Sequence, residues 1–294
     1  FYTANAADLT LTAADAWNDG DGGVLDSPTA NDNVDVDGFI MSIKKSADIG
    51  AITDSDAVAR DDAGDVLITS DVLSADLTIT IGSLHNEGLV DIKTLDADNS
   101  TMNVTFEGAF DTKQTLNIET TEVTANDDLT VTFAGRLTTG GAITIVADGN
   151  GLGSRSSDVT VNVAGHLTNG ADSSLNDNGG GLAKLVLNGT SLQEIAKEIE
   201  GASAGEGTIQ NSNTTNTVTF LEELGSTNEL LALTHDASTA TIHTLAVDAL
   251  TVTSAGTETY SAGGFKANTY NKTAGSATFD ATNAGDTINN IAGN

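Results

Sequence analysis

Residues 77–93 read LTITIGSLHNEGLVDIK, and the same pattern returns as MNVTFEGAFDTKQTLNIE at 102–119 and LTVTFAGRLTTGGAITIV at 129–146. A shorter copy, VNVAG, follows at 161–165. Each copy has a glycine at the equivalent place, at positions 82, 108, 135 and 165, so the repeat steps are 26, 27 and 30 residues. Self-similarity at such a period is typical of a solenoid, in which each repeat buries its apolar side against its neighbours.

The alternation within each copy predicts a strand with one buried and one wet side. Side chains of a strand point to opposite sides with period two, so Leu77, Ile79 and Ile81 share one side while Thr78 and Thr80 share the other. Corners are expected at the glycines, because Gly can take a positive φ. The sequence therefore predicts an all-β parallel β-helix, with a further strand in each repeat at 89–93, 116–119 and 142–146.

An antiparallel β-sandwich or jelly roll is the alternative, because it also has short strands at regular spacing. The turns decide between the two folds. They repeat in sequence and not only in length, as GSLHNEG at 82–88, GRLTTG at 135–140 and GHLTNG at 165–170. This favours the solenoid.

The chain divides into three expected parts, which are an entry or capping segment at 1–55, the repeat solenoid at 56–190 and a final segment at 191–294. The final segment is predicted to open with one short helix at 191–200, because Ser191 and Glu194 form a capping-box pattern and the apolar residues after them have helical spacing. It then returns to strands, and we expect the solenoid to continue beyond residue 294.

Charge is the most informative bulk property. The chain has 42 Asp plus Glu against 11 Lys plus Arg, a formal net charge of −31, and no Cys. Such a surface repels nucleic acid and anionic membranes, and the sequence has no apolar run long enough to insert into a membrane. It attracts divalent cations, and calcium prefers oxygen ligands. Solvation in salty water explains the acidity equally well.

Two places are candidates for calcium. The first is a loose oxygen cage formed by Asp19, Asp21, Asp32, Asp35 and Asp37. The second is Asp286, because the Gly-Asp-Thr-Ile run at 285–288 resembles a single copy of the calcium-binding repeat of RTX proteins. An EF-hand starting at Asn33 is rejected, because the twelfth position is Lys44 and not the required Glu.

Catalytic patterns are weak. The four histidines have no metal-ligand spacing, and His85 and His166 fall at nearby turn positions of the repeat, where they are expected to be wet. Nucleophile elbows and phosphate-binding loops are absent. Acid pairs of the kind a glycosidase needs arise by chance among 42 acids. The basic residues that a polysaccharide lyase needs are scattered. The sequence therefore favours a protein that is not an enzyme, with a polysaccharide-degrading enzyme as the least favoured alternative.

The opening of the chain carries a family resemblance. Trp17, the Gly-Gly pair at 22–23, Pro28 and the run NDNVDVDG at 31–38 resemble the start of bacterial surface β-helix proteins. Residues 9–170 are similar to surface-layer proteins and large secreted adhesins, and 285–288 to calcium-binding RTX repeats. The resemblance implies an extracellular structural protein that self-assembles into a surface layer or filament with the help of calcium. An adhesin stalk or glycan-binding module, with surface polysaccharide as partner, remains the alternative.

Overall fold

The structure is a computed structural model in which the regular secondary structure is almost entirely β. It describes residues 76–94, 101–120, 127–148, 157–236, 239–261, 264–279 and 287–293, together with the short segments 2–4, 8–10, 17–18, 24–25, 34–35, 40–43, 47–53 and 66–69. Within these ranges there is no α-helix, and the one helical turn is the 3₁₀ segment η1 (Asn178–Gly180). No helix in this part of the chain is long and apolar enough to cross a membrane.

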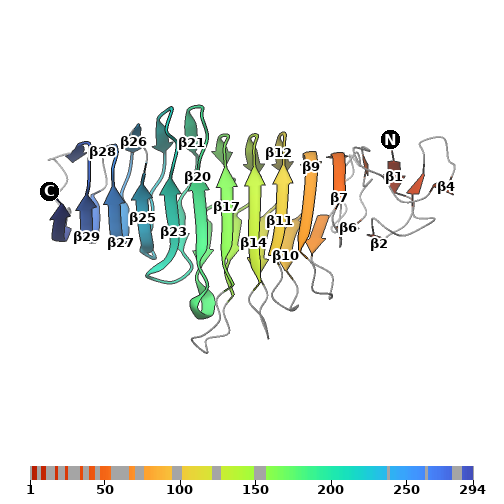
Figure 1. Cartoon of the computed structure of the whole chain (residues 1–294), viewed down its shortest axis with the longest axis horizontal. Helices are drawn as coiled ribbons and strands as arrows, with labels where there is room; N and C mark the ends of the chain where they lie inside the picture. The colour runs from red at the N-terminus through yellow and green to blue at the C-terminus, as the bar shows by residue number, and fades with distance from the viewer. Residues whose placement is uncertain are drawn as a thin grey trace.

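The strands stack into coils along the long axis of the molecule (Figure 1). The first face contains β7 (Ala47–Thr53), β9 (Leu77–Asn86), β11 (Thr101–Phe106), β14 (Asp128–Phe133), β17 (Val159–Val163), β20 (Ala183–Leu187), β23 (Glu206–Asn211), β25 (Leu230–His235), β27 (Val247–Ser254), β29 (Phe265–Lys272) and β31 (Thr287–Gly293). The second face contains the ends of β7 and β9, with β5 (Val34–Asp35), β12 (Phe110–Thr112), β15 (Leu137–Thr139), β18 (Leu167–Thr168), β21 (Gln193–Ile195), β24 (Val218–Phe220), β26 (Ala240–His243), β28 (Thr257–Tyr260) and β30 (Ala277–Phe279).

The third face contains β2 (Asp8–Thr10), β6 (Ile40–Ile43), β8 (Val66–Thr69), β10 (Val90–Thr94), β13 (Leu116–Thr120), β16 (Ile143–Val146), β19 (Ser173–Asn176) and β22 (Ile199–Gly201). These eight strands form their own sheet, and a 23-stranded sheet covers the other two faces. From β5 onward every pairing is parallel, which confirms the parallel β-helix and excludes an antiparallel sandwich. Antiparallel pairs occur near the start of the chain, where β3 (Trp17–Asn18) pairs with β1 (Tyr2–Ala4) and β4 (Val24–Leu25).

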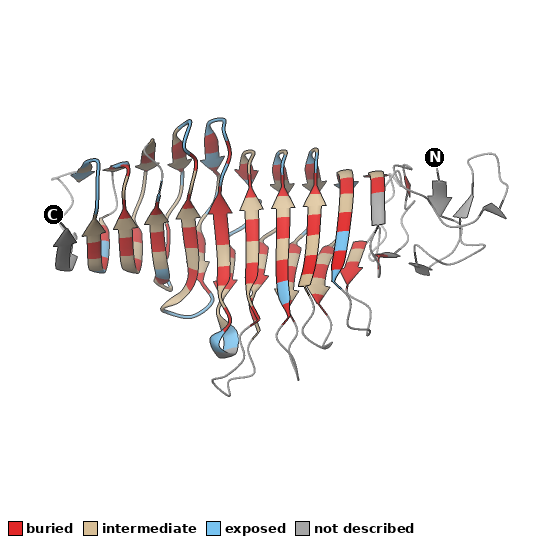
Figure 2. Ribbon diagram, viewed as in Figure 1, coloured by how far each residue is buried: buried red, intermediate tan, exposed pale blue. Residues whose placement is uncertain are grey.

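The predicted alternation of buried and wet residues is confirmed. Ile79 and Ile81 are completely buried and Leu77 nearly so, while Thr78 is exposed. Bands of buried and partly exposed residues accordingly cross each strand in turn (Figure 2). Phe106 and Phe133 occupy the same place in successive coils, with ring centroids 5.1 Å apart and an angle of 4° between their planes. Burial of each such side chain contributes about 1.5–3 kcal/mol.

The repeated glycines form the corner between the first and second faces. A Cβ on Gly108 would lie 2.6 Å from the carbonyl oxygen of Gly82, and one on Gly135 would lie 2.3 Å from that of Gly108. Gly165 is equally close to Gly135. None of these glycines has a positive φ. The expectation that they were needed for backbone conformation is therefore wrong, because what requires Gly here is the close stacking of one coil on the next.

Polar side chains close the next corner from inside. Thr112 Oγ1 donates to the Gly88 carbonyl at 2.6 Å, and Thr139 Oγ1 donates to the Gly141 carbonyl at 2.7 Å. Asn169, which occupies the same corner one coil further, donates to the Ala171 carbonyl. Carbonyls that the corner turns inward are satisfied in this way without water.

The predicted helix at 191–200 is wrong, because this segment forms β21 and β22. Leu192 is 45% exposed, whereas Ile195 and Ile199 are buried on two different faces of the coil. Their spacing reflects a corner between two strands and not a turn of helix. Glu194, assigned to a capping box, is exposed and faces His166 of the preceding coil, 3.8 Å from its Nδ1.

The coils become narrower toward the C-terminus. After β22 the third face is reduced to single bridges that join Ile199 to Leu224 and Leu224 to Val247. The parallel ladder nevertheless runs on without interruption, because β20 pairs with both β17 and β23. The last strand of the described residues is β31, which pairs with β29.

The outer surface of the first face has two central rows of side chains, which we call the threonine face. The strands from β9 to β29 contribute one residue to each row, in continuous parallel register. The first row is Thr78, Asn103, Thr130, Thr160, Lys184, Thr208, Ala232, Thr251 and Thr269, and the second is Thr80, Thr105, Thr132, Asn162, Val186, Gln210, Thr234, Thr253 and Asn271.

Candidate functional site

One interior position changes from apolar to polar along the solenoid. In the first coils it is taken by Ile81, Phe106, Phe133, Val163 and Leu187. In the later coils the same position is taken by Asn211, His235, Ser254 and Lys272. Together with the residues that they contact on the second face, these four side chains form a buried polar cluster, which is the candidate functional site.

Two histidines lie at its centre. His235 on β25 and His243 on β26 are each 1% exposed, and their Nε2 atoms are 3.4 Å apart. Their Nδ1 atoms are buried and have no hydrogen-bond partner. Burial, with the nearby positive charge of Lys272, lowers the pKa of His235 to about 3. Burial, and then His235, lowers the pKa of His243 well below its usual value, so both rings are neutral at pH 7.

An ion pair between a partly buried lysine, 19% exposed, and a completely buried glutamate lies in the next coils. Lys272 Nζ is 3.1 Å from Glu258 Oε1 and 3.0 Å from Oε2, and it also donates to Ser254 Oγ at 2.8 Å and to the Gly256 carbonyl. The Tyr270 hydroxyl donates to Glu258 Oε2 at 3.0 Å. The Glu258 side chain is completely buried, and this burial raises its pKa although Lys272 and Tyr270 act in the opposite direction.

A column of stacked rings runs through the same coils as the cluster, along the second face. His243 lies between Phe220 and Tyr260, with centroid distances of 4.9 and 4.8 Å and planes within 3° of parallel. Phe279 continues the stack beyond Tyr260 at 5.0 Å. The Tyr260 hydroxyl is buried without a partner, and burial followed by the charge of Glu258 raises its pKa.

Side-chain amides extend the cluster toward the middle of the chain. Asn211 donates to Thr241 Oγ1 at 2.8 Å, and Asn213 donates to Gln193 Oε1 at 3.0 Å. Gln193 in turn donates to the carbonyls of Val163 and Gly165. The polar groups therefore form a chain along the inside of one corner, over several coils.

This arrangement is suited to holding coils together and not to turning over a substrate. Its histidines and Glu258 have almost no exposed surface, so a substrate has no access to them. The two imidazoles supply two metal ligands at most. Wherever side chains are described, no group of three or more His, Cys, Asp and Glu residues is placed to hold a metal ion.

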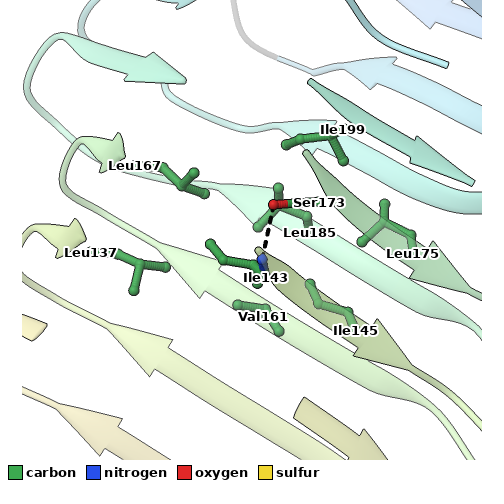
Figure 3. Close-up of a pocket in the computed structure, with 9 residues that line it drawn as sticks. All are labelled: Leu137, Ile143, Ile145, Val161, Leu167, Ser173, Leu175, Leu185 and Ile199. Carbon is green, nitrogen blue, oxygen red and sulfur yellow. Dashed lines mark hydrogen bonds between the residues drawn. The ribbon is translucent and has the colours of Figure 1, made fainter. Parts of the chain in front are cut away.

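A small apolar cavity lies inside the earlier coils (Figure 3). It is lined by aliphatic side chains that include Leu137, Val161 and Leu185, and by Ser173, whose Oγ accepts a hydrogen bond from the Ile143 amide at 3.0 Å. The space open to the centre of a water-sized sphere is ≈ 10 Å³. An apolar void of this size stays dry and is too small for an organic substrate.

The metal ligands proposed from sequence are not tested by this structure. Asp19, Asp21, Asp32, Asp37 and Asp286 lie outside the described residues. Asp35 is described for its backbone alone, which pairs in β5 with Thr3 and Thr53. Calcium at these positions therefore stays a prediction.

The sequence reasoning missed the buried polar cluster. His85 and His166 lie on the surface near acids of the next coil, as predicted for turn residues of the repeat. His235 and His243 were given no place by the sequence, and both lie inside. A signal was available. Continuing the repeat alignment past Gly165 would have placed His235 in register with Phe133 and Val163, at an inward position.

Comparison with known proteins adds no assignment to this parallel β-solenoid. No protein-family model matches the chain, and no match to a curated protein or to a solved structure was found. The resemblance to bacterial surface β-helix proteins therefore stays a prediction from the sequence.

Proposed function

We propose that this chain is a non-enzymatic structural protein of a microbial cell surface, a rod that assembles with further copies of itself. The observation that carries this proposal is the unbroken parallel ladder from β5 to β31, with an interior filled by side chains. Each coil adds about 4.8 Å of hydrogen-bonded length. A long body of stacked coils is suited to spanning distance and presenting a surface.

The distribution of polar groups supports a structural role over an enzymatic one. Hydrolysis or elimination on a polysaccharide needs acids and bases that converge in a groove open to the polymer. In the described coils the titratable side chains that come together, among them His243, Glu258 and Lys272, contact one another inside the rod and do not line a groove. Glycan binding by stacking on aromatic rings is also disfavoured, because no Phe or Tyr ring is exposed among the side chains that the structure describes.

Calcium belongs to the proposal because of the net charge of −31. Carboxylates brought together across an interface repel one another within the screening length of about 8 Å at physiological salt. Calcium relieves this repulsion by accepting oxygens from two chains. The candidate ligands are Asp19, Asp21, Asp32, Asp35 and Asp37.

Sedimentation velocity and melting temperature, measured in chelator and in millimolar calcium, test the proposal. We expect a monomer in chelator, and larger species or a raised melting temperature in calcium. Changing the five aspartates to Asn should remove the calcium response. A control variant neutralises acids of the described faces, namely Asp91, Asp111, Glu119, Glu194 and Asp236, and should keep it.

Two results would contradict parts of this reasoning. The same sedimentation and melting temperature in chelator and in calcium would show that calcium has no role in the assembly. A wild-type chain that stays monomeric at high concentration, with calcium and at high salt, would overturn the self-assembling role itself.

A further inference from the structure

The threonine face differs in charge from the rest of the molecule. Neither of its rows contains an Asp or Glu, although the chain has 42 of them, and its one charged residue is Lys184. Outward positions on the third face include Asp91 and Glu119, and those on the second face include Asp111 and Glu194. Thr is common in any strand because of its branched side chain, but this preference does not explain the absence of acids on one face.

The acids that border the threonine face are turned along the sheet. Asp76 Oδ1 accepts a hydrogen bond from the Thr101 amide at 3.1 Å, and Asp128 Oδ1 accepts one from the Asp158 amide at 3.2 Å. Asp158 Oδ1 accepts from the Leu182 amide at 3.0 Å. Each of these carboxylates is held against the following coil, at the edge where the strands begin. At the opposite edge, Asp236 Oδ2 accepts hydrogen bonds from Gln210 Nε2 of the second row and from Ser212 Oγ. Carboxylates therefore border the two rows, but none belongs to them.

The geometry of the face suits a flat contact. Parallel strands in register place equivalent side chains about 4.8 Å apart, and residues two apart in one strand are separated by about 6.6 Å. From β9 to β29 the face is therefore about 38 Å long. A width of four residues, about 13 Å, gives about 500 Å² on each copy and about 1,000 Å² in total, near the lower limit for a specific interface.

We propose that the threonine face binds the same face of a second copy of this chain. This inference rests on the proposed self-assembly and names the surface that performs it. Charge selects the occupant, because two copies that each carry −31 repel least where neither presents a carboxylate. Two such sheets pack about 10 Å apart with their strands within about 30° of each other, so that the rods lie side by side. The threonine and asparagine side chains then supply both methyl contacts and hydrogen bonds across the interface.

The area predicts that one such contact is weak and that many act together. An interface of about 1,000 Å² without large aromatic anchors is typical of transient pairs. An array in which each rod makes the contact repeatedly gains from multivalency. The face therefore supplies lateral packing, and the acidic remainder of the surface is left for calcium or solvent.

A pair of charge-matched variants tests the face. Thr105→Glu with Thr132→Glu places two carboxylates at the centre of the second row. Asn117→Glu with Thr144→Glu makes the same change on the third face, at outward strand positions with similar exposure. Circular dichroism and melting temperature should show both variants folded. In sedimentation velocity we expect the first variant to associate at least about tenfold more weakly than wild type, because like charges would meet in the interface, and the second to match wild type.

Cross-linking tests the same face by detecting contact between copies directly, without a variant that weakens their association. The chain has no Cys, so Thr132→Cys introduces a single thiol on the face and Thr144→Cys introduces one on the third face. A short thiol-reactive cross-linker should yield covalent dimers for Thr132→Cys and few for Thr144→Cys.

The outcomes separate this inference from the function on which it rests. Wild-type assembly that the face variant retains in full, or equal cross-linking at both positions, would overturn the face and leave self-assembly standing. A wild-type chain that never associates would overturn both. A chain that stays monomeric but sediments with an insoluble uncharged polysaccharide would also overturn the pairing of copies, and would assign the face to that polymer.

Discussion

Acidification should weaken the C-terminal coils through the two buried histidines. The perturbation is a fall in pH from 7 to 5. Above pH 6.5 both rings are neutral in the folded and in the unfolded chain, so they add no pH dependence. Below pH 6.5 the unfolded chain binds protons at His235 and His243, whereas the folded chain excludes them because both folded pKa values are lowered. The free energy of unfolding therefore falls as pH falls, and for His235 the fall continues to about pH 3.

The size of the effect follows from the lowered pKa. Each pH unit below 6.5 costs about 1.4 kcal/mol for each ring that stays neutral, so His235 accounts for about 2 kcal/mol at pH 5. His243 adds a contribution of the same sign. Lys272 faces His235 and acts in the same direction, whereas the raised pKa of Glu258 acts in the opposite one, because the folded chain then holds a proton more readily than the unfolded chain. Tyr260 and Tyr270, whose pKa values are raised, stay neutral throughout this range.

A variant isolates the histidines from the many other acids. His235→Asn matches Asn211 in the same interior row, and His243→Phe matches Phe220 in the adjacent ring stack. Hydrogen exchange, corrected for the pH dependence of exchange in an open chain, should report more frequent opening of β25 and β26 in wild type at pH 5 than at pH 7. The same fall in pH should increase opening less in the double variant, which keeps the other titratable groups. The exposed His166→Asn serves as the control and should behave as wild type. Wild-type and double-variant curves that run parallel between pH 7 and 5 would refute the reasoning.

Three further changes have defined outcomes in urea denaturation. Lys272→Met should lower the free energy of unfolding by about 3–5 kcal/mol, because the buried carboxylate of Glu258 loses its charge partner. Lys266→Met, on the surface, should lower it by at most about 1 kcal/mol. Equal costs for the two variants would contradict a structural role for the Lys272–Glu258 pair. Phe133→Ala should cost about 3–5 kcal/mol and Thr132→Ala less than about 1 kcal/mol, and the reverse order would contradict the assignment of inner and outer sides. Gly135→Ala should cost about 1–3 kcal/mol through a clash with the preceding coil, and a neutral result would show that the coils can separate at this corner.

Much of the fold was predictable because the alternation of apolar and polar residues is strict. Leu129, Val131 and Phe133 alternate with threonines, and a period of two indicates a half-buried strand. Because the copies also share a turn sequence, the strands are expected to recur in equivalent coils. The segment 191–200 was misread because a coil corner can place two apolar residues at helical spacing. Local sequence cannot distinguish Ile195 and Ile199 on two faces of a coil from the same residues on one face of a helix, since the stacking that separates them involves the neighbouring coils.

The buried polar cluster was harder to predict because polar residues in strands are normally read as solvent-facing. His235, Ser254 and Lys272 are inside because their register with Leu187 places them there, not because of their chemistry. The polar residue types predicted exposed side chains, whereas the strand register predicted buried ones. The threonine face shows the reverse situation, since its residues look ordinary one by one and its lack of acids becomes visible when the strands are placed side by side.

In the coils from β11 to β18 the glycine corner limits where this protein can change in length during evolution. Phe106 to Phe110, Phe133 to Leu137 and Val163 to Leu167 are the same distance apart in the chain, since the stacked corner of these coils leaves no room for a side chain. In the next coil Leu187 and Ile195, which continue the same two rows, are further apart, so the corner has been lengthened there. The connections from the third face back to the first differ in length, as those from β13 to β14 and from β16 to β17 show. Insertions can accumulate at those connections while the pitch of the rod stays fixed. A peptide inserted there for display, between Thr120 and Asp128, should be carried at the side of the rod without altering the spacing of its coils.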